Sequence, residues 1–183
     1  MERSTIFAGF GGQGILFAGK VLAEAAMLEG LEVLWIPSYG PEMRGGTASC
    51  TIIVADEAIG SPIVDRADHA VVLNPPSLAR YGPVVAPGGL LVVNTTLIEA
   101  EAGRDDVDVL EVPCTALARL AGDDKLVSVV ALGALVGRRP FVQPESVRRA
   151  LERVIGANHA NLLAADLAAF DRGREAGLAE IIA

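Results

Sequence analysis

The sequence predicts an α/β fold in which one three-layer domain, residues 1–183, holds a mixed, mainly parallel sheet and C-terminal helices. Two observations indicate this fold. Short β-branched segments alternate with longer segments of helical periodicity, which is the pattern of α/β proteins. The chain has 183 residues, which is enough for one domain with a sizeable core and too few for two ordinary ones.

The first half of the chain is expected to supply three strands and a long helix. In order, they are a strand at 5–8, a helix at 15–30 and strands at 31–36 and 47–55. The helix has few polar positions, chiefly Lys20, Glu24 and Glu29, so we expect the sheet to cover one of its sides and something else a second side. The short connection between the second and third strands cannot form a helical crossover, so this pair is expected to be antiparallel or separated within the sheet.

The second half of the chain alternates strands with helices and then becomes helical. The predicted strands span 69–74, 90–94 and 107–112, and the predicted helices span 75–81, 117–121, 126–136, 144–156 and 158–172. The helix at 144–156 has the clearest pattern, because its apolar residues recur at helical spacing between Pro144 and Gly156. The tail after Gly173 is expected to fray.

Composition and charge exclude several classes of protein. The chain is 51% apolar with a mean hydropathy of +0.43, yet no apolar run approaches the ~20 residues that a membrane span needs. The net charge of −8 argues against binding to nucleic acid. The first residues do not resemble a signal peptide. We therefore expect a cytoplasmic protein with neither a nucleic-acid nor a membrane partner.

The cysteines and histidines do not form a metal-binding pattern. Cys50 and Cys114 are far apart in the chain, and the two histidines are equally isolated. Neither an iron–sulfur cluster nor a zinc site can be assembled from this chain alone, so any redox metal is expected to belong to a partner. Cys50 is interpreted as a small core residue rather than a nucleophile.

A glycine-rich segment between the first strand and the first helix is the first candidate site. It matches the pattern G-x-G-x-x-G, and its candidate binding residues are Gly9, Gly11, Gly12, Gln13 and Gly14. Glycines let the backbone turn tightly and approach a ligand, and the N–H groups at the helix start can receive an anion. The alternative is a tight turn without a ligand. At Gly11 we expect either a positive φ or a close approach of a ligand or partner.

The acidic residue that would hold the ribose of a dinucleotide is missing. It is expected about 20 residues further on, at the end of the second strand. That strand ends in Leu34-Trp35-Ile36-Pro37-Ser38. This gap weakens the interpretation as a Rossmann-type dinucleotide site.

The loop after the second strand is the second candidate site. Its candidate residues are Ser38, Tyr39, Gly40, Glu42, Arg44, Gly45 and Gly46. Arg44 offers a planar, charged group for a carboxylate or phosphate, although such a loop can also simply face water. Loops that leave the same ends of neighbouring strands meet at a crevice, which Asn74 could also line, although a turn entering a helix explains Asn74 equally well.

These motifs together resemble the gamma chain of the ferredoxin-dependent 2-oxoacid oxidoreductases, of the pyruvate, 2-oxoglutarate, ketoisovalerate or indolepyruvate type. The resemblance covers residues 5–168. It is carried by G-F-G-G-Q-G at 9–14, Y-G-P-E-M-R-G-G at 39–46, the strand that follows Asp68, and Ala131-Leu132-Gly133 in a later helix. The family commonly has Asn where this chain has Ser128, so a contact at that position does not carry over.

The resemblance implies a Rossmann-like domain that takes part in oxidative decarboxylation of a 2-oxoacid to an acyl-CoA, with ferredoxin as electron acceptor. Thiamine diphosphate, Mg and iron–sulfur clusters are then expected in alpha and beta subunits and possibly a ferredoxin-like delta subunit, while this chain shapes the site around coenzyme A. No catalytic or metal-binding residue is assigned to this chain. Two alternatives are a stand-alone nucleotide-binding oxidoreductase and a purely structural scaffold.

Overall fold

The computed structural model describes residues 1–39, 47–156 and 160–179. Its sheet contains six strands in the order β2-β3-β1-β4-β5-β6. They are β1 (Glu2–Phe10), β2 (Glu32–Tyr39), β3 (Thr47–Ala55), β4 (Ala67–Val72), β5 (Val85–Asn94) and β6 (Asp108–Val112). The pairs β1/β4, β4/β5 and β5/β6 are parallel, whereas β3 is antiparallel to both β1 and β2. The predicted mixed sheet is confirmed, and of the two alternatives for the second and third strands the structure has the antiparallel pair.

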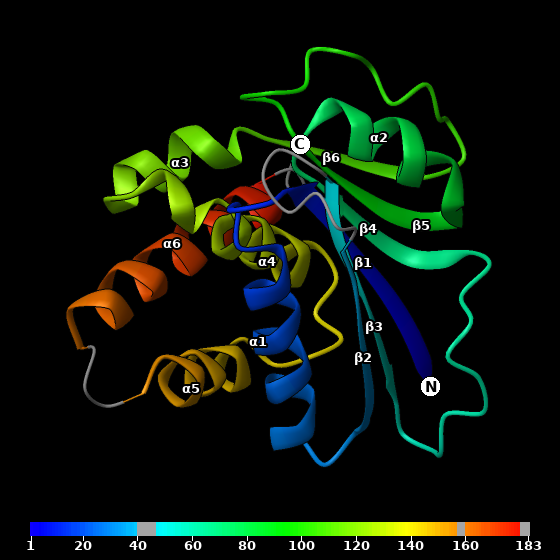
Figure 1. Ribbon diagram of the computed structural model, residues 1–183, viewed down its shortest axis with the longest axis horizontal. Helices are drawn as coiled ribbons and strands as arrows, with labels where there is room; N and C mark the ends of the chain where they lie inside the picture. The colour runs from blue at the N-terminus through cyan, green and yellow to red at the C-terminus, as the bar shows by residue number, and fades with distance from the viewer. Residues whose placement is uncertain (40–46, 157–159, 180–183) are drawn as a thin grey trace.

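Helices cover both faces of the sheet (Figure 1). One face carries α1 (Ile15–Leu28), α3 (Cys114–Ala121), α4 (Val127–Arg138), α5 (Pro144–Ile155) and α6 (Ala160–Ala179). The other face carries α2 (Pro75–Tyr81). Two 3-10 turns, η1 (Gly82–Val84) and η2 (Asp124–Leu126), precede β5 and α4. Each face has its own apolar cluster, so the three-layer arrangement buries both sides of the central strands.

Helix α1 is covered on two sides, as its few polar residues indicate. It packs on β1, β2 and β3, and α5 lies against it from the other side. An ion pair of 3.0 Å between Arg153 Nη1 and Glu24 Oε1 links the rims of these two helices. The element that covers the second side of α1 is therefore α5, from the same chain.

The last helix extends further than predicted. The chain does not fray at Gly173, because α6 continues to Ala179 and packs along α4. Gly173 and Gly177 of α6 face the α4 backbone so closely that a Cβ atom on either would collide with the carbonyl oxygens of Val130 and Ala134. These glycines allow helix–helix contact at backbone distance, which the hydrophobic periodicity alone does not reveal. The predicted start of this helix lies partly outside the described residues.

Several predicted boundaries also differ from the structure. Strand β1 runs through Gly9 and Phe10, which pair with β3, so the glycine motif begins inside the strand. Strand β4 starts at Ala67 and ends at Val72, before Leu73 and Asn74. Helix α3 begins at Cys114, three residues early. Among the described residues, no helix is both long enough and apolar enough to cross a lipid bilayer.

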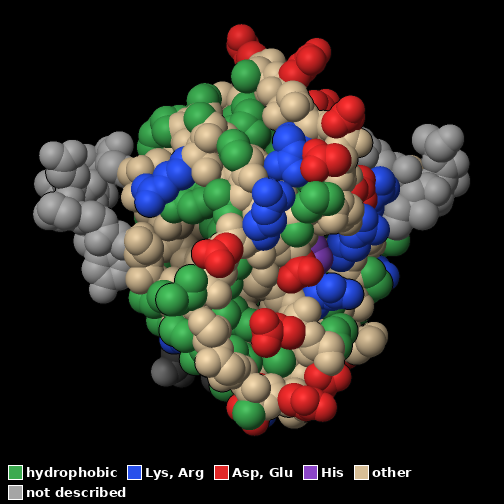
Figure 2. All heavy atoms as spheres, turned by 90° about the vertical axis from the view of Figure 1, so that its right-hand side faces the viewer, with side chains coloured by type: hydrophobic (Ala, Val, Ile, Leu, Met, Phe, Trp, Pro, Cys, Tyr) green, Lys and Arg blue, Asp and Glu red, His purple; other side chains and the backbone are tan. Residues whose placement is uncertain are grey.

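The surface carries both signs of charge in close alternation. Figure 2 shows basic and acidic side chains interspersed over the face that lies to the right in Figure 1, with basic groups gathered beside a histidine. The net charge of −8 is therefore not spread as one uniform field. Local basic sites exist on an acidic protein.

Candidate functional site

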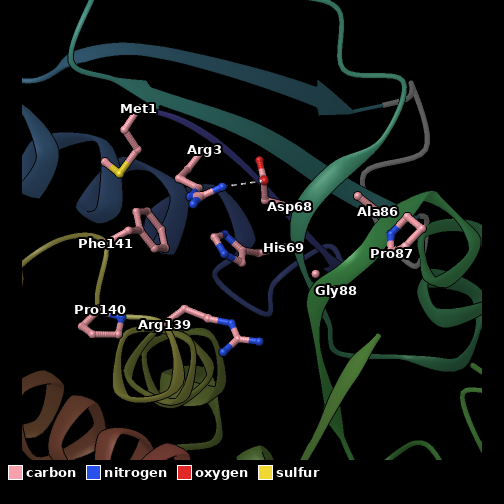
Figure 3. Close-up of a pocket in the computed structure, with 11 residues that line it drawn as sticks. Met1, Arg3, Asp68, His69, Ala86, Pro87, Gly88, Arg139, Pro140 and Phe141 are labelled. Atoms are coloured by element: carbon pink, nitrogen blue, oxygen red, sulfur yellow. Dashed lines mark hydrogen bonds and ion pairs between the residues drawn. The ribbon is translucent and has the colours of Figure 1, made fainter. Parts of the chain in front are cut away.

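The structure has a cavity at each edge of the parallel strands. One, of about 390 Å³, lies where β1, β4 and β5 begin, and His69 is among the residues that line it (Figure 3). The other, of about 260 Å³, lies at the carboxyl ends of the strands beside Gly12 and Gln13. Both predicted loops leave from the carboxyl edge, where open α/β sheets bind ligands.

The glycine loop and the end of β2 lie at the same edge of the sheet. Phe10 of β1 pairs with Thr47, and Tyr39 of β2 pairs with Ala48, so β3 starts between them. Ser38 is exposed at this end of β2. The other candidates of this loop lie outside the described residues, namely Gly40, Glu42, Arg44, Gly45 and Gly46.

Hydrogen bonds within the glycine loop fix its shape. The Gln13 side-chain oxygen accepts a bond of 2.6 Å from the Phe10 N–H, and the Gln13 N–H donates to the Phe10 carbonyl at 3.1 Å. A Cβ atom on Gly9 would lie 2.5 Å from Gln13 Oε1 and 2.8 Å from Ile15 Cδ1. The Gln13 side chain thus closes the turn by its hydrogen bond to Phe10, and it occupies the space that a side chain at Gly9 would need.

Two other glycines supply the left-handed backbone of the loop. Gly12 has a φ of +97° and Gly14 a φ of +76°. Gly11 is exposed and is not among the positive-φ glycines, so of the two alternatives expected at Gly11 the positive φ is not found, and a close approach of a ligand or partner stays a prediction. A Cβ atom on Gly14 would lie 2.5 Å from Ser128 Oγ at the start of α4. Ser128, the position where the family commonly has Asn, therefore lies beside this loop.

Asn74 is fully buried and caps helix α2. Its side-chain oxygen accepts a hydrogen bond of 2.8 Å from the Ser77 N–H. Its Nδ2 atom and the hydroxyls of Ser77 and Ser128 have no hydrogen-bond partner within the described part of the chain. Of the two readings of Asn74, the structure supports the helix turn, because the side chain is buried rather than placed on the wall of a crevice.

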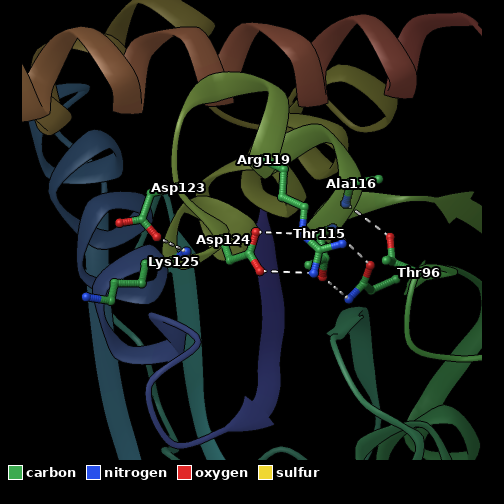
Figure 4. A network of polar contacts seen from close by, with 8 residues as sticks. Thr96, Thr115, Ala116, Arg119, Asp123, Asp124 and Lys125 are labelled. Carbon is green, nitrogen blue, oxygen red and sulfur yellow. Dashed lines mark hydrogen bonds and ion pairs between the residues drawn. The ribbon is translucent and has the colours of Figure 1, made fainter.

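The cavity beside the glycine loop is lined by residues from four segments. They are Gly12, Gln13, Leu97, Thr115, Arg119, Asp124, Lys125 and Val127. Gly12 and Gln13 of this lining lead into α1, whose start has no side-chain cap, so no side chain that the structure describes caps the first N–H groups of α1. The start of α3 is closed, because Asn94 Oδ1 and Thr96 Oγ1 accept hydrogen bonds from the N–H groups of Thr115 and Ala116, each at 3.2 Å (Figure 4).

Lys125 is the more available of the two basic groups that line this cavity. The other one, Arg119, donates two hydrogen bonds of 2.8 and 3.0 Å to Asp124, and this contact raises the pKa of Arg119. Lys125 is exposed and makes no ion pair among the residues that the structure describes. Lys125 and Thr115 are not candidates from the sequence, because only the fold brings η2 and the start of α3 to the glycine loop.

Neither cysteine is a nucleophile. Burial raises the pKa of Cys50 and that of Cys114 to about 12, and both thiols are enclosed in the core. Since the thiolate is the reactive form, these groups are inert at neutral pH. Cys50 is a small core residue, as its sequence position indicates.

Comparison with known proteins identifies relatives along nearly the whole chain. Residues 4–176 match the family model described as "Pyruvate ferredoxin/flavodoxin oxidoreductase". The 2-oxoglutarate synthase subunit KorC of Methanocaldococcus jannaschii is 33% identical over 183 residues, covering 96% of this chain and 94% of KorC. The ketoisovalerate oxidoreductase subunit VorA of Methanothermobacter thermautotrophicus is 43% identical over 129 residues, but the match covers 70% of this chain and only 27% of VorA.

The fold agrees with a solved relative. The crystal structure of a keto/oxoacid ferredoxin oxidoreductase gamma subunit from Geobacter sulfurreducens superposes with a TM-score of 0.84 at 27% identity. The match covers 97% of this chain and 99% of that one.

Proposed function

Because the chain belongs to the pyruvate ferredoxin/flavodoxin oxidoreductase family, we propose that it is the gamma subunit of a 2-oxoacid:ferredoxin oxidoreductase complex. Similarity to KorC over nearly the full length of both chains supports a separate subunit of this kind. The complex oxidatively decarboxylates a 2-oxoacid to an acyl-CoA and passes the electrons to ferredoxin. Two free, buried cysteines suit a reducing compartment, and we place the complex in the cytoplasm.

The partners of this chain carry the redox chemistry in this proposal. Alpha and beta subunits, with a ferredoxin-like delta subunit in some assemblies, hold thiamine diphosphate, Mg and iron–sulfur clusters. These groups supply the carbanion chemistry and the electron path. The part of this chain is to bind and orient coenzyme A beside the active site. The 38–46 segment, with Arg44, is proposed to border the same interface.

The cavity at the carboxyl edge is the observation that carries the role in coenzyme A binding. Coenzyme A presents phosphate groups, and phosphates bind at uncapped helix starts and beside lysines. Lys125 lines this cavity, as do Gly12 and Gln13, which lead into the uncapped start of α1. We assign the phosphate contacts to the Gly12–Gly14 backbone and to Lys125.

Reconstitution tests the subunit role. The purified chain, supplied with 2-oxoacids, coenzyme A, thiamine diphosphate, Mg and a ferredoxin-like dye, is expected to show no oxidation, and activity is expected only after addition of its copurifying subunits. Activity of the cofactor-supplemented chain alone would overturn the subunit role. Tight binding of NAD(P) to the isolated chain would favour a stand-alone oxidoreductase instead.

The two lysines of the chain allow a direct test of the coenzyme A site. Lys125→Gln is expected to raise the KM for coenzyme A about tenfold in the reconstituted complex, because a charge-assisted phosphate contact of about 1.5 kcal/mol is lost. Lys20→Gln, on the exposed stripe of α1, is the matched control and should leave this KM unchanged. Coenzyme A should also protect Lys125, but not Lys20, from acetylation. Equal protection of both lysines, with unchanged kinetics of both variants, would leave only the scaffold role.

A further inference from the structure

The cavity at the amino edge of the sheet has a wall built by an irregularity in strand pairing. Along β4 and β5, Ala67 pairs with Val85 but His69 pairs with Leu90, so residues 86–89 leave the regular ladder. These residues form one side of the cavity. A Cβ atom on Gly89 would lie 2.5 Å from the Asp68 carbonyl oxygen, so this wall needs glycine. Such irregularities re-aim side chains next to binding sites.

His69 lines this cavity, and contacts with Thr5 and Phe141 leave one of its ring nitrogens without a hydrogen bond to a described residue. Only 4% of the residue is exposed. Its Nδ1 atom lies 3.2 Å from Thr5 Oγ1, and its ring stacks on Phe141 with centroids 4.9 Å apart and planes 13° from parallel. No hydrogen bond joins Nε2 to any residue that the structure describes. The ring lies between Arg3 and Arg139 (Figure 3).

The charged side chains that act on His69 are two arginines and one aspartate, namely Arg3, Arg139 and Asp68. Arg3 Nη1 pairs with Asp68 at 3.2 Å, and Arg139 Nη2 pairs with Asp108 at 3.0 Å. A guanidinium has five N–H donors, so each arginine keeps donors for another acceptor. The Asp68 carboxylate is further engaged by the N–H and hydroxyl of Ser4, at 2.8 and 3.0 Å. The remaining charge at the rim is the Met1 amine, which pairs with Asp56.

These surroundings keep the imidazole neutral when nothing is bound. Burial lowers the pKa of His69 to about 4, and the positive charges of Arg3 and Arg139 act in the same direction, against the opposite effect of Asp68. An anion placed among these three side chains would reverse the balance of charge. It would also give the unpaired Nε2 atom an acceptor once the ring is protonated.

We propose that this cavity binds a small oxyanion, a carboxylate or phosphate group, through the guanidinium groups of Arg3 and Arg139 and the Nε2 atom of His69. Its volume of about 390 Å³ is that of a small-molecule site. Charge-assisted hydrogen bonds from arginine and histidine are suited to planar or tetrahedral oxyanions. The site lies at the opposite edge of the strands from Lys125, so it does not depend on the proposed role in coenzyme A binding.

Anion binding and protonation of His69 are coupled in this proposal. A bound anion favours the imidazolium, and by reciprocity the protonated site binds the anion more tightly. Sulfate is a suitable probe because its own charge does not change between pH 5 and 8. If bound sulfate returns the pKa of His69 to about 6.5, its ordinary value, sulfate should bind about tenfold more tightly at pH 5.5 than at pH 7.5.

Calorimetry and NMR on the full chain test the site. Sulfate is titrated at constant ionic strength against chloride, with acetate as a second probe that distinguishes a carboxylate site from a tetrahedral one. The chain has only two histidines, so His159→Gln assigns the imidazole signals and allows the titration of His69 to be followed. Saturating sulfate is expected to raise the apparent pKa of His69.

Variants separate an anion site from a merely structural cluster. Arg139→Gln and Arg3→Gln are each expected to weaken sulfate binding at least tenfold, while Arg172→Gln, at an exposed position on α6, leaves it unchanged. His69→Phe keeps a ring that can stack on Phe141 and should remove the pH dependence of binding. If one arginine variant fails to fold by circular dichroism, the other carries the test. Absence of sulfate binding, equal binding by the folded arginine variants, or a His69 titration that sulfate does not move would each overturn the proposal.

Discussion

Single residues in the glycine loop have separable roles. Gly12 and Gly14 both adopt a left-handed backbone, but a Cβ atom on Gly12 would meet nothing within 4 Å, whereas one on Gly14 would lie 2.5 Å from Ser128 Oγ. The cost of a side chain therefore comes from φ alone at Gly12 and from φ plus a collision at Gly14. The two positions form a matched pair.

We predict that Gly12→Ala lowers the free energy of unfolding by about 1–2 kcal/mol, the cost of a left-handed alanine. Gly14→Ala is expected to cost more, because the Ser128 hydroxyl must also move. Urea unfolding measures both. In a Ser128→Ala background the difference between the two variants should shrink, and an unchanged difference would refute the collision.

Asp166 is a buried acid on α6 whose ionisation opposes folding. Only 7% of the residue is exposed, and burial raises its pKa from 3.8 to about 6. The folded chain thus holds this proton more tightly than the unfolded chain. Stability therefore falls as the pH rises from 3.8 to about 6, the loss is complete above about pH 6, and it is absent below 3.8.

Asp166→Asn is accordingly expected to stabilise the protein at pH 8 by about 1–3 kcal/mol and to have little effect near pH 4. Chemical unfolding at both pH values checks this. Glu175→Gln, an exposed position on the same helix, serves as the control and should show no comparable pH dependence. If Asp166→Asn changed the free energy of unfolding equally at both pH values, the claim that burial of the Asp166 carboxylate opposes its ionisation would be wrong.

At the scale of elements, α4 and α6 form the closest helix pair. Gly133 and Gly137 on α4 face the backbone of Phe170 and Arg174, and Gly173 on α6 faces Val130. All α4 residues from Val127 to Gly137 are buried. Small residues on both helices let the backbones touch, which places α4 between the sheet and α6.

Gly173→Ala should therefore destabilise the protein by about 1–3 kcal/mol or more, although alanine is the better helix former by about 1 kcal/mol. Overpacking against the Val130 carbonyl outweighs the helix propensity. The urea midpoint measures the loss. Gly60→Ala, where a Cβ atom would meet nothing within 4 Å, is the control. A stabilised Gly173→Ala protein would show that the two helices can separate at little cost.

At the scale of the whole molecule, the sheet joins two apolar clusters. Phe7 and Val71 belong to the cluster under α1 and α4, and Ile6 and Val72 belong to the cluster under α2. Alternate residues of the same strands supply both clusters, so neither layer can unfold while the other keeps its strands. We propose on this basis that residues 1–183 form one cooperative domain.

Cooperative unfolding is the expected result for the isolated chain. Trp35 is the only tryptophan and lies on β2, at the edge of the sheet, so its fluorescence reports that edge. Far-UV circular dichroism reports the helices of both faces. The two urea transitions should coincide, as in a two-state domain. Separate transitions would show that the chain contains two units.

The sequence by itself determined the class of the fold, because hydrophobic periodicity and turn residues are local properties. It placed most of the strands, the amphipathic helix that begins at Pro144 and the glycine loop. The resemblance of its two glycine-bearing motifs also identified the family. Errors were concentrated at ends of elements, such as Gly173, where contact with another element decides whether a helix continues.

The tertiary structure alone decided which residues share a site. Lys125 and Gln13 are far apart in the chain but line one cavity, whereas Asn74, chosen from its position after a strand, is buried as a helix cap. The surroundings of His69 were equally hidden, because its neighbours come from three separate segments. Distances between side chains depend on long-range packing, and no local pattern in the sequence records them.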